Sequence, residues 1–321
     1  MAQLVGIARL AAESPSLEAK RRTEYFELAT RKYLSRCTSP RMPFRWMINP
    51  YRGCEFGCKY CYARYTHEFM ELRESEDFEK KIFVKHFEAA AFRAELHALP
   101  RGETIAIGTA TDPYQPAERK FRLTRSILEL LAQSAGYHIG LVTKSDLVSR
   151  DIDIFQEISR RNYLTLVITI TTLDSELARL LEPLAPRPDL RLGAVRKLSA
   201  AGLRVAVNLA PILPLLNDSE PSLDAVAKAS ARAGAVQLSG NVVYLKECAR
   251  KVFFPFLRDY FPSYLRRYQE RFERGAYLRG AYPETIRERL DRIRRRYGLQ
   301  ERKAEPDPEL WPQEPQMTLF S

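Results

Sequence analysis

The sequence predicts an α/β fold in which parallel strands alternate with helices. The first observation is that, between Phe44 and Leu245, apolar segments of strand length alternate about six times with segments of helical periodicity. Apolar strands separated by helices form parallel βαβ units. The second observation is that residues 1–40 and the segment after Leu245 depart from this rhythm, and are expected to extend the central domain. Eight units close a full barrel of about 250 residues, and six are too few to do so.

Residues 1–40 are predicted to form a helical N-terminal extension. Ser16–Arg36 is rich in Glu, Lys and Arg together with other good helix formers. The segment lacks the apolar stretch and small-residue cleavage site of a signal peptide. Cys37 lies beside Thr38, Ser39 and Pro40, which is a loop composition, and is assigned a structural or incidental role.

Residues 41–245 carry the repeating units. Strands are expected in short apolar runs, and helices where apolar residues recur on one face. The predicted strands are Phe44–Ile48, Thr104–Gly108, His138–Thr143, Tyr163–Ile170, Leu203–Leu209 and Ala235–Leu238. The predicted helices are His86–Leu99, Glu118–Ala135, Leu147–Arg160, Ser175–Leu181, Leu190–Ala201 and Leu223–Ala233.

Composition limits the environment and the partners. No run of about eighteen apolar residues is present, so no membrane-spanning helix is expected. Five cysteines, an odd number, do not suit a secreted disulfide scaffold, and a cytoplasmic location is expected because thiols stay reduced there. The net charge is +11, and Lys246–Lys303 contains 17 Lys and Arg against 8 Asp and Glu. This basic excess either attracts nucleic acid or forms a solvated helical face.

Three of the five cysteines lie in the loop after the first predicted strand. Cys54, Cys58 and Cys61 have the spacing C-x3-C-x2-C, with Gly53 and Gly57 among them. Glycine permits positive φ and a close approach of the backbone, which a loop around a compact inorganic core requires. Thiolates are the usual ligands of iron–sulfur clusters. Three thiolates hold three irons of a cubane and leave the fourth iron open for chemistry.

A zinc site is the alternative for the same cysteines. Structural zinc takes four ligands, so a fourth would have to come from Cys37, His67 or Cys248.

Polar residues follow four of the predicted strands, where sites form on parallel sheets. Structural alternatives exist for each: Asp112 and Ser145 suit helix N-caps, threonine is common in strands, and Pro211 and Pro214 brace a turn. The polar candidates are Thr109, Thr111, Asp112, Lys144, Ser145, Thr171 and Asn208, and the backbone near Ile212 is a further candidate.

The cysteine spacing, with Tyr60 directly before the last cysteine, resembles the radical S-adenosylmethionine (SAM) superfamily. The resemblance implies a partial (β/α)6 TIM-like barrel and a [4Fe–4S] cluster held by the three cysteines. It also implies that SAM binds the open iron and is cleaved reductively to a 5′-deoxyadenosyl radical. In this reading Tyr60 and the strand-end candidates shape the SAM pocket, with Thr109, Thr111 and Asp112 near the amino group. Lys144 is expected at the carboxylate, Thr171 at the ribose and Ile212 at the adenine.

Four further segments resemble the spore photoproduct lyase-like branch of that superfamily. They are N-P-Y-R-G-C, T-D-P-Y-Q-P-x-E, T-K-S and A-P-I-x-P, and the likeness covers residues 44–218. It implies hydrogen abstraction from damaged or modified nucleic acid, with flavodoxin or ferredoxin as electron donor. The lyases carry a hydrogen-donor cysteine in the segment matching Gly108–Asp112, and this chain has none there. Tyr114 is the candidate substitute for that cysteine.

Residues 246–303 are predicted to form a basic, aromatic, helical extension. Ile286, Leu290, Ile293 and Tyr297 form one helical stripe that is expected to pack on the barrel. Arginines occupy the other faces and would meet solvent or phosphate. The aromatics either bind single-stranded or flipped bases or close the open side of the barrel. Cys248 is expected to be a buried, neutral thiol.

Residues 304–321 are predicted to be a disordered tail. Its end, Gln316–Ser321, resembles the short peptide by which bacterial DNA polymerases and repair proteins dock on the sliding clamp. Leu319 and Phe320 would fill an apolar pocket while Gln316 makes polar contacts. Alternatively, the two apolar residues pack on the chain's own barrel.

Two other functions fit the same sequence. One is a radical SAM enzyme that acts on a protein or a small molecule. The other is a non-catalytic iron–sulfur protein that binds nucleic acid and is tethered to the sliding clamp.

Overall fold

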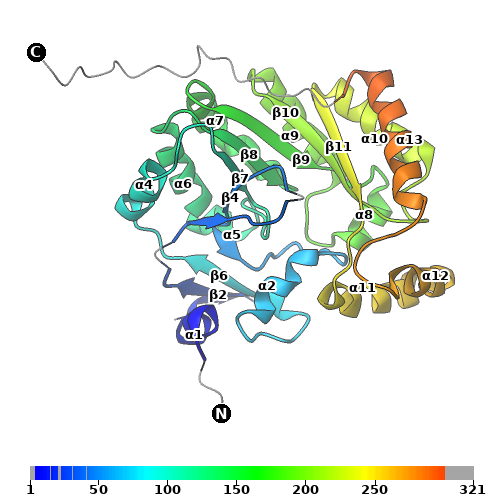
Figure 1. Ribbon diagram of the computed structural model, residues 1–321, viewed down its shortest axis with the longest axis horizontal. Coiled ribbons are helices and arrows are strands. Elements are labelled where there is room, and N and C mark those ends of the chain that lie inside the picture. Colours follow the sequence, from blue (N-terminus) through cyan, green and yellow to red (C-terminus); the bar gives the residue numbers. More distant parts are fainter. Residues whose placement is uncertain (1–3, 15, 21–22, 31, 41, 301–321) are drawn as a thin grey trace, which may run out of the picture.

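The computed structural model describes residues 4–14, 16–20, 23–30, 32–40 and 42–300. Its centre is a curved sheet of seven strands within these residues, in the order β11-β10-β9-β8-β7-β4-β3 (Figure 1). The parallel strands are β4 (Trp46–Ile48), β7 (Thr104–Ile107), β8 (His138–Thr143), β9 (Tyr163–Thr169), β10 (Val205–Ile212) and β11 (Gln237–Val242). β3 (Leu34–Arg36) pairs antiparallel with β4 at the edge. The prediction of a partial (β/α)6 barrel is confirmed.

Alternating burial explains why the central strands form. On β8 and β9 every second side chain is buried, and the register pairs Ile139 with Leu164 and Leu141 with Leu166. A one-residue slip would move this apolar set to the other face, so burial fixes the register.

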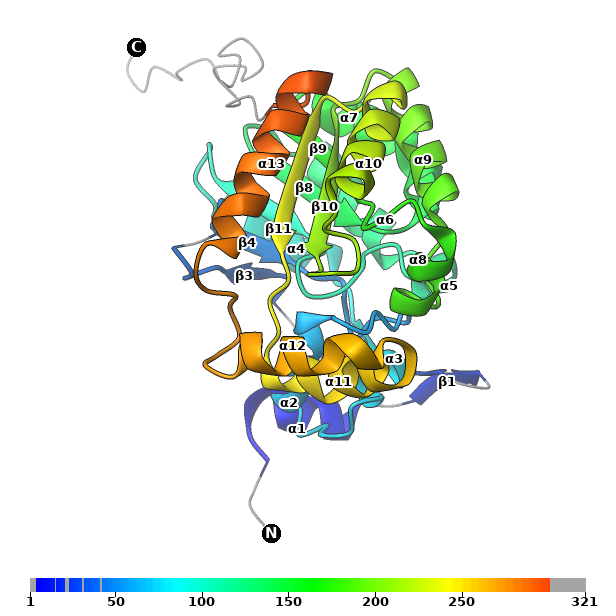
Figure 2. The same ribbon diagram turned by 90° about the vertical axis from the view of Figure 1, so that its right-hand side faces the viewer.

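Helices on the outer face of the sheet pack against this apolar set and bury it. They are α4 (Ala89–His97), α6 (Leu123–Ala132), α7 (Ile152–Ser159), α9 (Pro188–Ala200) and α10 (Glu220–Arg232) (Figure 2). The predicted single helix Glu118–Ala135 is interrupted, because Arg122 has φ +51° between α5 (Ala117–Phe121) and α6. The predicted helix Leu147–Arg160 likewise begins as the 3₁₀ helix η2 (Asp146–Asp151) before α7.

The prediction of helix over Ser16–Arg36 is wrong. A helix, α1 (Gly6–Glu13), precedes this segment, but the segment itself forms β1 (Ser16–Lys20), β2 (Thr23–Leu28) and β3. β1 and β2 belong to a second sheet, ordered β1-β2-β6-β5, with β6 (Lys81–Lys85) and β5 (Tyr51–Arg52). β2 pairs in parallel with β6, and this partner lies more than fifty residues away in the sequence. Burial of Tyr25 and Leu28 therefore outweighs local helix propensity.

The C-terminal region is helical, as predicted. α11 (Glu247–Tyr260) and α12 (Pro262–Phe272) lie across the carboxyl ends of β10 and β11, whereas α13 (Tyr282–Tyr297) runs alongside β11 (Figure 2). The apolar stripe of α13 packs on the barrel as expected, because Ile286, Leu290 and Ile293 are all at most 3% exposed. A Cβ placed on Gly240 of β11 would lie 3.0 Å from Leu290 Cδ1.

Residues 304–321, with the predicted clamp-binding residues Gln316, Leu319 and Phe320, lie outside the described residues. None of the described helices is both long and apolar enough to cross a bilayer.

Replacing Leu290 by alanine is expected to lower the free energy of unfolding by about 2–5 kcal/mol, because it leaves a cavity between α13 and β11. Urea denaturation of the purified protein measures the change. Arg295→Ala, on an exposed position of the same helix, is the control and is expected to stay within about 0.5 kcal/mol of the parent. Equal effects of the two substitutions would contradict the packing of α13 on the barrel.

Candidate active site

The cysteine loop begins directly after β5 and is bent by two glycines. Gly53 has φ +82° and Gly57 has φ +62°. A Cβ on Gly53 would lie 2.8 Å from the carbonyl oxygens of both Lys81 and Phe78, so no other residue fits without moving the backbone. The amide of Cys54 donates to the same Phe78 oxygen at 2.9 Å. The glycines predicted to shape the loop do so.

The loop is fastened to the segment that follows β7. Thr111 Oγ1 donates to the carbonyl oxygen of Gly53 at 2.6 Å, and Gln115 Nε2 donates to the same atom at 3.2 Å. In return, the amide of Glu55 donates to Gln115 Oε1 at 3.0 Å, and the amide of Ala117 donates to Glu55 Oε1 at 2.7 Å. Glu55, Thr111 and Gln115 are all buried, so these bonds are shielded from water. Thr111, predicted as a SAM contact, thus forms a hydrogen bond with the cysteine loop itself.

The C-terminal helices cover the same loop. Cys54 and Cys58 belong to a buried cluster that also contains aromatic and aliphatic side chains of α11 and α12. These include Phe253, Phe256, Leu257, Tyr268 and Phe272. Most aromatics of α11 and α12 therefore close the barrel end, the alternative that the sequence left open. Cys248 is buried and the pKa of its thiol is raised by burial, as predicted.

The three loop thiols lie together in a dry environment. All five cysteines are free, and Cys54 and Cys58 are 8% and 7% exposed. Burial, opposed by the charge of Lys144 and assisted by those of Glu182 and Cys61, raises the pKa of Cys58 to about 12. Burial likewise raises the pKa of Cys54 and Cys61, and mutual repulsion among the thiolates contributes at Cys54. A positively charged metal core reverses this balance, because metal binding deprotonates thiols.

The donor set favours a cluster over a single ion. Among the described residues, no three His, Cys, Asp or Glu side chains converge closely enough to hold one metal ion. A cubane instead places each thiolate on a different iron, so its cysteines stand further apart than zinc ligands do. His67, a possible fourth zinc ligand, is buried with Nε2 3.0 Å from the carbonyl oxygen of Lys81. The residues present therefore fit an iron–sulfur cluster better than zinc.

A buried ion pair that sequence analysis missed lies behind Tyr60. Glu182, at the end of α8 (Ser175–Leu181), pairs with Arg191 of α9 at 2.5 Å, and both side chains are at most 2% exposed. Glu182 also accepts hydrogen bonds from the hydroxyls of Tyr60 and Thr171, the latter at 2.6 Å. Thr171, predicted near the ribose, is therefore tied to the cysteine loop through this carboxylate.

Lys144 lies between this pair and the cysteine loop. Its Nζ is 5.8 Å from the centre of the Tyr60 ring, a cation–π distance. Burial opposes its charge, but the nearby Cys58 and Glu182 outweigh burial and raise the pKa of Lys144. The ammonium makes no contact-distance ion pair with another described residue.

Asp112 joins the ends of two neighbouring strands. Its carboxylate accepts from Thr143 Oγ1 at 2.6 Å, from the amide of Lys144 at 2.8 Å and from the amide of Tyr114 at 2.9 Å. Burial raises its pKa, although these three hydrogen bonds oppose the shift. The visible role of Asp112 is to hold Lys144 at the end of β8.

The remaining candidates make other contacts at the strand ends. Thr109 Oγ1 accepts from Asn49 Nδ2 at 3.2 Å, and Asn208 Oδ1 accepts from Ser239 at 3.0 Å. Ser145 caps η2 by accepting from the amide of Leu147, the structural alternative considered above. Ile212 is fully buried at the end of β10.

Tyr114 is held in a structural network. It is 1% exposed, and its hydroxyl donates to Asp151 at 2.8 Å. Asp151 in turn pairs with Arg125 and Arg150, each at 2.7 Å. This geometry gives no support to Tyr114 as a hydrogen donor.

Residues 48–225 match the sequence model of the Radical SAM superfamily, which is more than half of the chain. The chain belongs to the radical SAM superfamily. An uncharacterized protein of Mycobacterium tuberculosis is 37% identical over 282 residues, covering 87% of this chain and 83% of that protein. An uncharacterized protein of Methanocaldococcus jannaschii is 30% identical over 183 residues, covering 55% of this radical SAM chain and 63% of the relative.

Solved structures show the same fold. Spore photoproduct lyase complexed with dinucleoside spore photoproduct superposes with a TM-score of 0.63 and 17% identity, covering 84% of this chain and 79% of the lyase. This radical SAM enzyme therefore has the fold of that lyase. Its family implies SAM and an iron–sulfur cluster, for which Cys54, Cys58 and Cys61 are the fitting ligands.

Glu182→Gln is expected to destabilise the protein by about 3–5 kcal/mol, because Arg191 then keeps a buried charge without a counter-ion. Urea denaturation under anaerobic conditions measures this. Glu176→Gln is the matched control on the same helix, since Glu176 pairs with Arg179 at 3.0 Å on the exposed surface, where such pairs contribute at most about 1 kcal/mol. A loss at Glu182 no larger than at Glu176 would refute the structural role of the buried pair.

Proposed function

We propose that this radical SAM enzyme abstracts hydrogen from damaged or modified nucleic acid. The observation that carries the proposal is a row of tyrosines beside the last cluster cysteine. Tyr62 directly follows Cys61 and is 42% exposed, and its ring centre lies 6.3 Å from that of Tyr244. Tyr244 in turn lies 4.4 Å from Tyr277, which is 50% exposed.

This tyrosine row suits an unpaired base. Exposed rings bind bases by stacking, and each stacked base contributes about 1–3 kcal/mol. A base must leave the duplex before chemistry reaches it, and aromatic side chains stabilise the extruded state. Tyr62 is fixed in place because its hydroxyl donates to the carbonyl oxygen of Thr109. Lys246, 3.7 Å above the Tyr65 ring, adds a cation beside the row.

Within the barrel, SAM and the cluster together supply the hydrogen-abstracting radical when they are bound. Lys144 is proposed to bind the carboxylate of SAM, because its buried ammonium makes no contact-distance ion pair among the described residues. Asp112 and Tyr60 position that ammonium through the contacts given above. Thr109, Thr111, Ser145, Thr171, Asn208 and Ile212 remain proposed pocket residues at the strand ends.

The hydrogen donor is expected to differ from that of the lyase. Gly108–Asp112 contains no cysteine, so the returning hydrogen must come from another donor. The structurally similar lyase was solved with a dinucleoside spore photoproduct, which makes a nucleotide substrate for this chain reasonable.

The arginines of α13 contribute less to this proposal than their number suggests. Arg287, Arg292, Arg294 and Arg296 each pair with an acidic side chain, and Arg289 donates to the carbonyl oxygen of Asp218 at 2.6 Å. Their charge is therefore partly neutralised within the protein. The sliding clamp and a flavodoxin- or ferredoxin-type donor stay predictions from the sequence.

SAM cleavage tests the enzyme assignment. Anaerobically reconstituted protein with SAM and dithionite is expected to form 5′-deoxyadenosine, and UV-irradiated single-stranded DNA is expected to increase the rate. Cys58→Ala should abolish the reaction, whereas Cys37→Ala should not. Absence of 5′-deoxyadenosine under every condition would favour the non-catalytic alternative. A rate indifferent to DNA would favour a protein or small-molecule substrate.

Tyr277→Ala is expected to weaken binding of single-stranded DNA by about 5- to 150-fold, the loss of one stacked base. Fluorescence anisotropy with a labelled oligonucleotide measures the affinity. Tyr260→Ala is the control, because Tyr260 is similarly exposed, at 57%, on α11 outside the tyrosine row. Equal affinities of the two variants would argue against base stacking on the row.

A further inference from the structure

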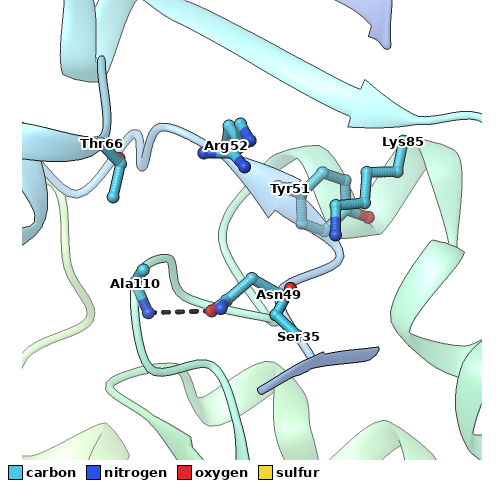
Figure 3. Close-up of a pocket in the computed structure, with 7 residues that line it drawn as sticks. All are labelled: Ser35, Asn49, Tyr51, Arg52, Thr66, Lys85 and Ala110. Carbon is cyan, nitrogen blue, oxygen red and sulfur yellow. Dashed lines mark hydrogen bonds between the residues drawn. The ribbon is translucent and has the colours of Figure 1, made fainter. Parts of the chain in front are cut away.

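A small polar pocket lies beside the start of the cysteine loop. Asn49 and Arg52 line it from the segment before Cys54, Lys85 from the end of β6, Thr66 from α2 (Tyr65–Glu68) and Ala110 from the loop after β7. Figure 3 shows these side chains around a shared space, with Asn49 held by a hydrogen bond from the amide of Ala110 at 2.8 Å. The pocket thus lies between the two sheets, next to the proposed cluster.

Two cations in this pocket lack a counter-ion. Lys85 is 7% exposed, and the Nε of Arg52 is buried without a hydrogen-bond partner. Neither side chain forms a hydrogen bond or ion pair with any other described residue. The nearby Arg64 differs, because it pairs with Glu79 at 2.6 Å.

Glu95 acts on Lys85 through its charge but forms no ion pair with either cation. The Glu95 carboxylate, on α4, instead accepts from the backbone amides of Tyr33 and Leu34 at 2.8–3.1 Å. Burial, together with the charge of Arg52, lowers the pKa of Lys85 to about 8. Buried charges normally occur with a partner, because desolvation without one is costly. The pocket is therefore built for an anion that comes from outside the chain.

We propose that the Arg52–Lys85 pocket binds one phosphate group of the nucleic-acid substrate. A guanidinium fork and an ammonium together match the oxygens of a phosphate, and such charged hydrogen bonds are strong. The cavity of about 50 Å³ holds a few waters, at roughly 10–15 Å³ for each, or one phosphate, but not a nucleotide. Arg52 lies two residues before Cys54, so a phosphate held here fixes the chain beside the cluster. The choice of a phosphodiester rests on the proposed function, whereas the anion site does not.

The anion site is tested first with inorganic phosphate on the reconstituted protein. Phosphate is expected to raise the melting temperature of the parent, and chloride at equal ionic strength is not. Lys85→Met should raise the melting temperature without phosphate, since it removes an unpaired buried charge, and should lose the phosphate response. Arg93→Met, an exposed position on α4 that also removes one charge, should keep it. An undiminished phosphate response in Lys85→Met, or none in the parent, would overturn the site.

The source of the phosphate is tested with oligonucleotides. Lys85→Met and Arg52→Gln should each weaken binding of single-stranded DNA about tenfold or more, and neither should affect an oligonucleotide with neutral methylphosphonate linkages. The slope of log affinity against log salt should fall by about 0.7 for each phosphate that is no longer neutralised. If the parent protein responds to phosphate but binds no DNA, the anion site stands and its assignment to a phosphodiester is refuted. If DNA stimulates SAM cleavage but both variants bind DNA as tightly as the parent, the proposed function stands and the role of the pocket in binding a DNA phosphate is refuted.

Discussion

The enclosure of the cysteine loop, with Cys54 and Cys58 buried and Cys61 half-buried, is the constraint on which the rest of this structure depends. Cys54 and Cys58 are buried as thoroughly as core leucines, yet their chemistry requires the thiolate form. The loop keeps them there because Gly53 fits against two carbonyl oxygens, while Thr111 and Gln115 hold it from the barrel side. The aromatic cluster of α11 and α12 closes the other side. Without that cover, water and oxygen would reach a cluster bound at the loop.

The alternation of strands and helices was predictable because each unit carries its signal locally. β8 alternates in burial over six residues, and its sequence bounds agree with the structure. The N-terminal strands carry no such signal. β2 is a strand because β6 lies beside it, and the pairing of Tyr25 with Ile82 spans a sequence distance that no local pattern reports. The interruption of the predicted helix at Arg122 likewise depends on a side-chain contact, because the Glu118 carboxylate accepts a hydrogen bond from the amide of Thr124 across the break.

The same difference between local and long-range signals applies to the residues of the site. The cysteine spacing is local, so the cluster ligands could be identified directly. Glu182 and Arg191 sit in an ordinary helical sequence, and only the fold shows that they meet behind Tyr60. The tyrosine row is assembled by an isolated bridge between Tyr244 and Tyr277, thirty-three residues apart. Lys144 was predicted from its position after a strand, and Asp112 now gives the physical reason for its placement.

Charge distribution shows most clearly why composition alone misleads about nucleic acid. The C-terminal excess of Lys and Arg suggested a phosphate-binding face, yet acidic residues of α10 neutralise part of it, as Glu220 does for Arg292 and Asp224 for Arg296. A paired arginine must give up its partner before it binds phosphate, whereas an unpaired buried one gains a partner. By this criterion Arg52 and Lys85 are better placed to bind an anion than the arginines on the exposed face of α13. The cations that recognise an anion are those that the fold leaves without one.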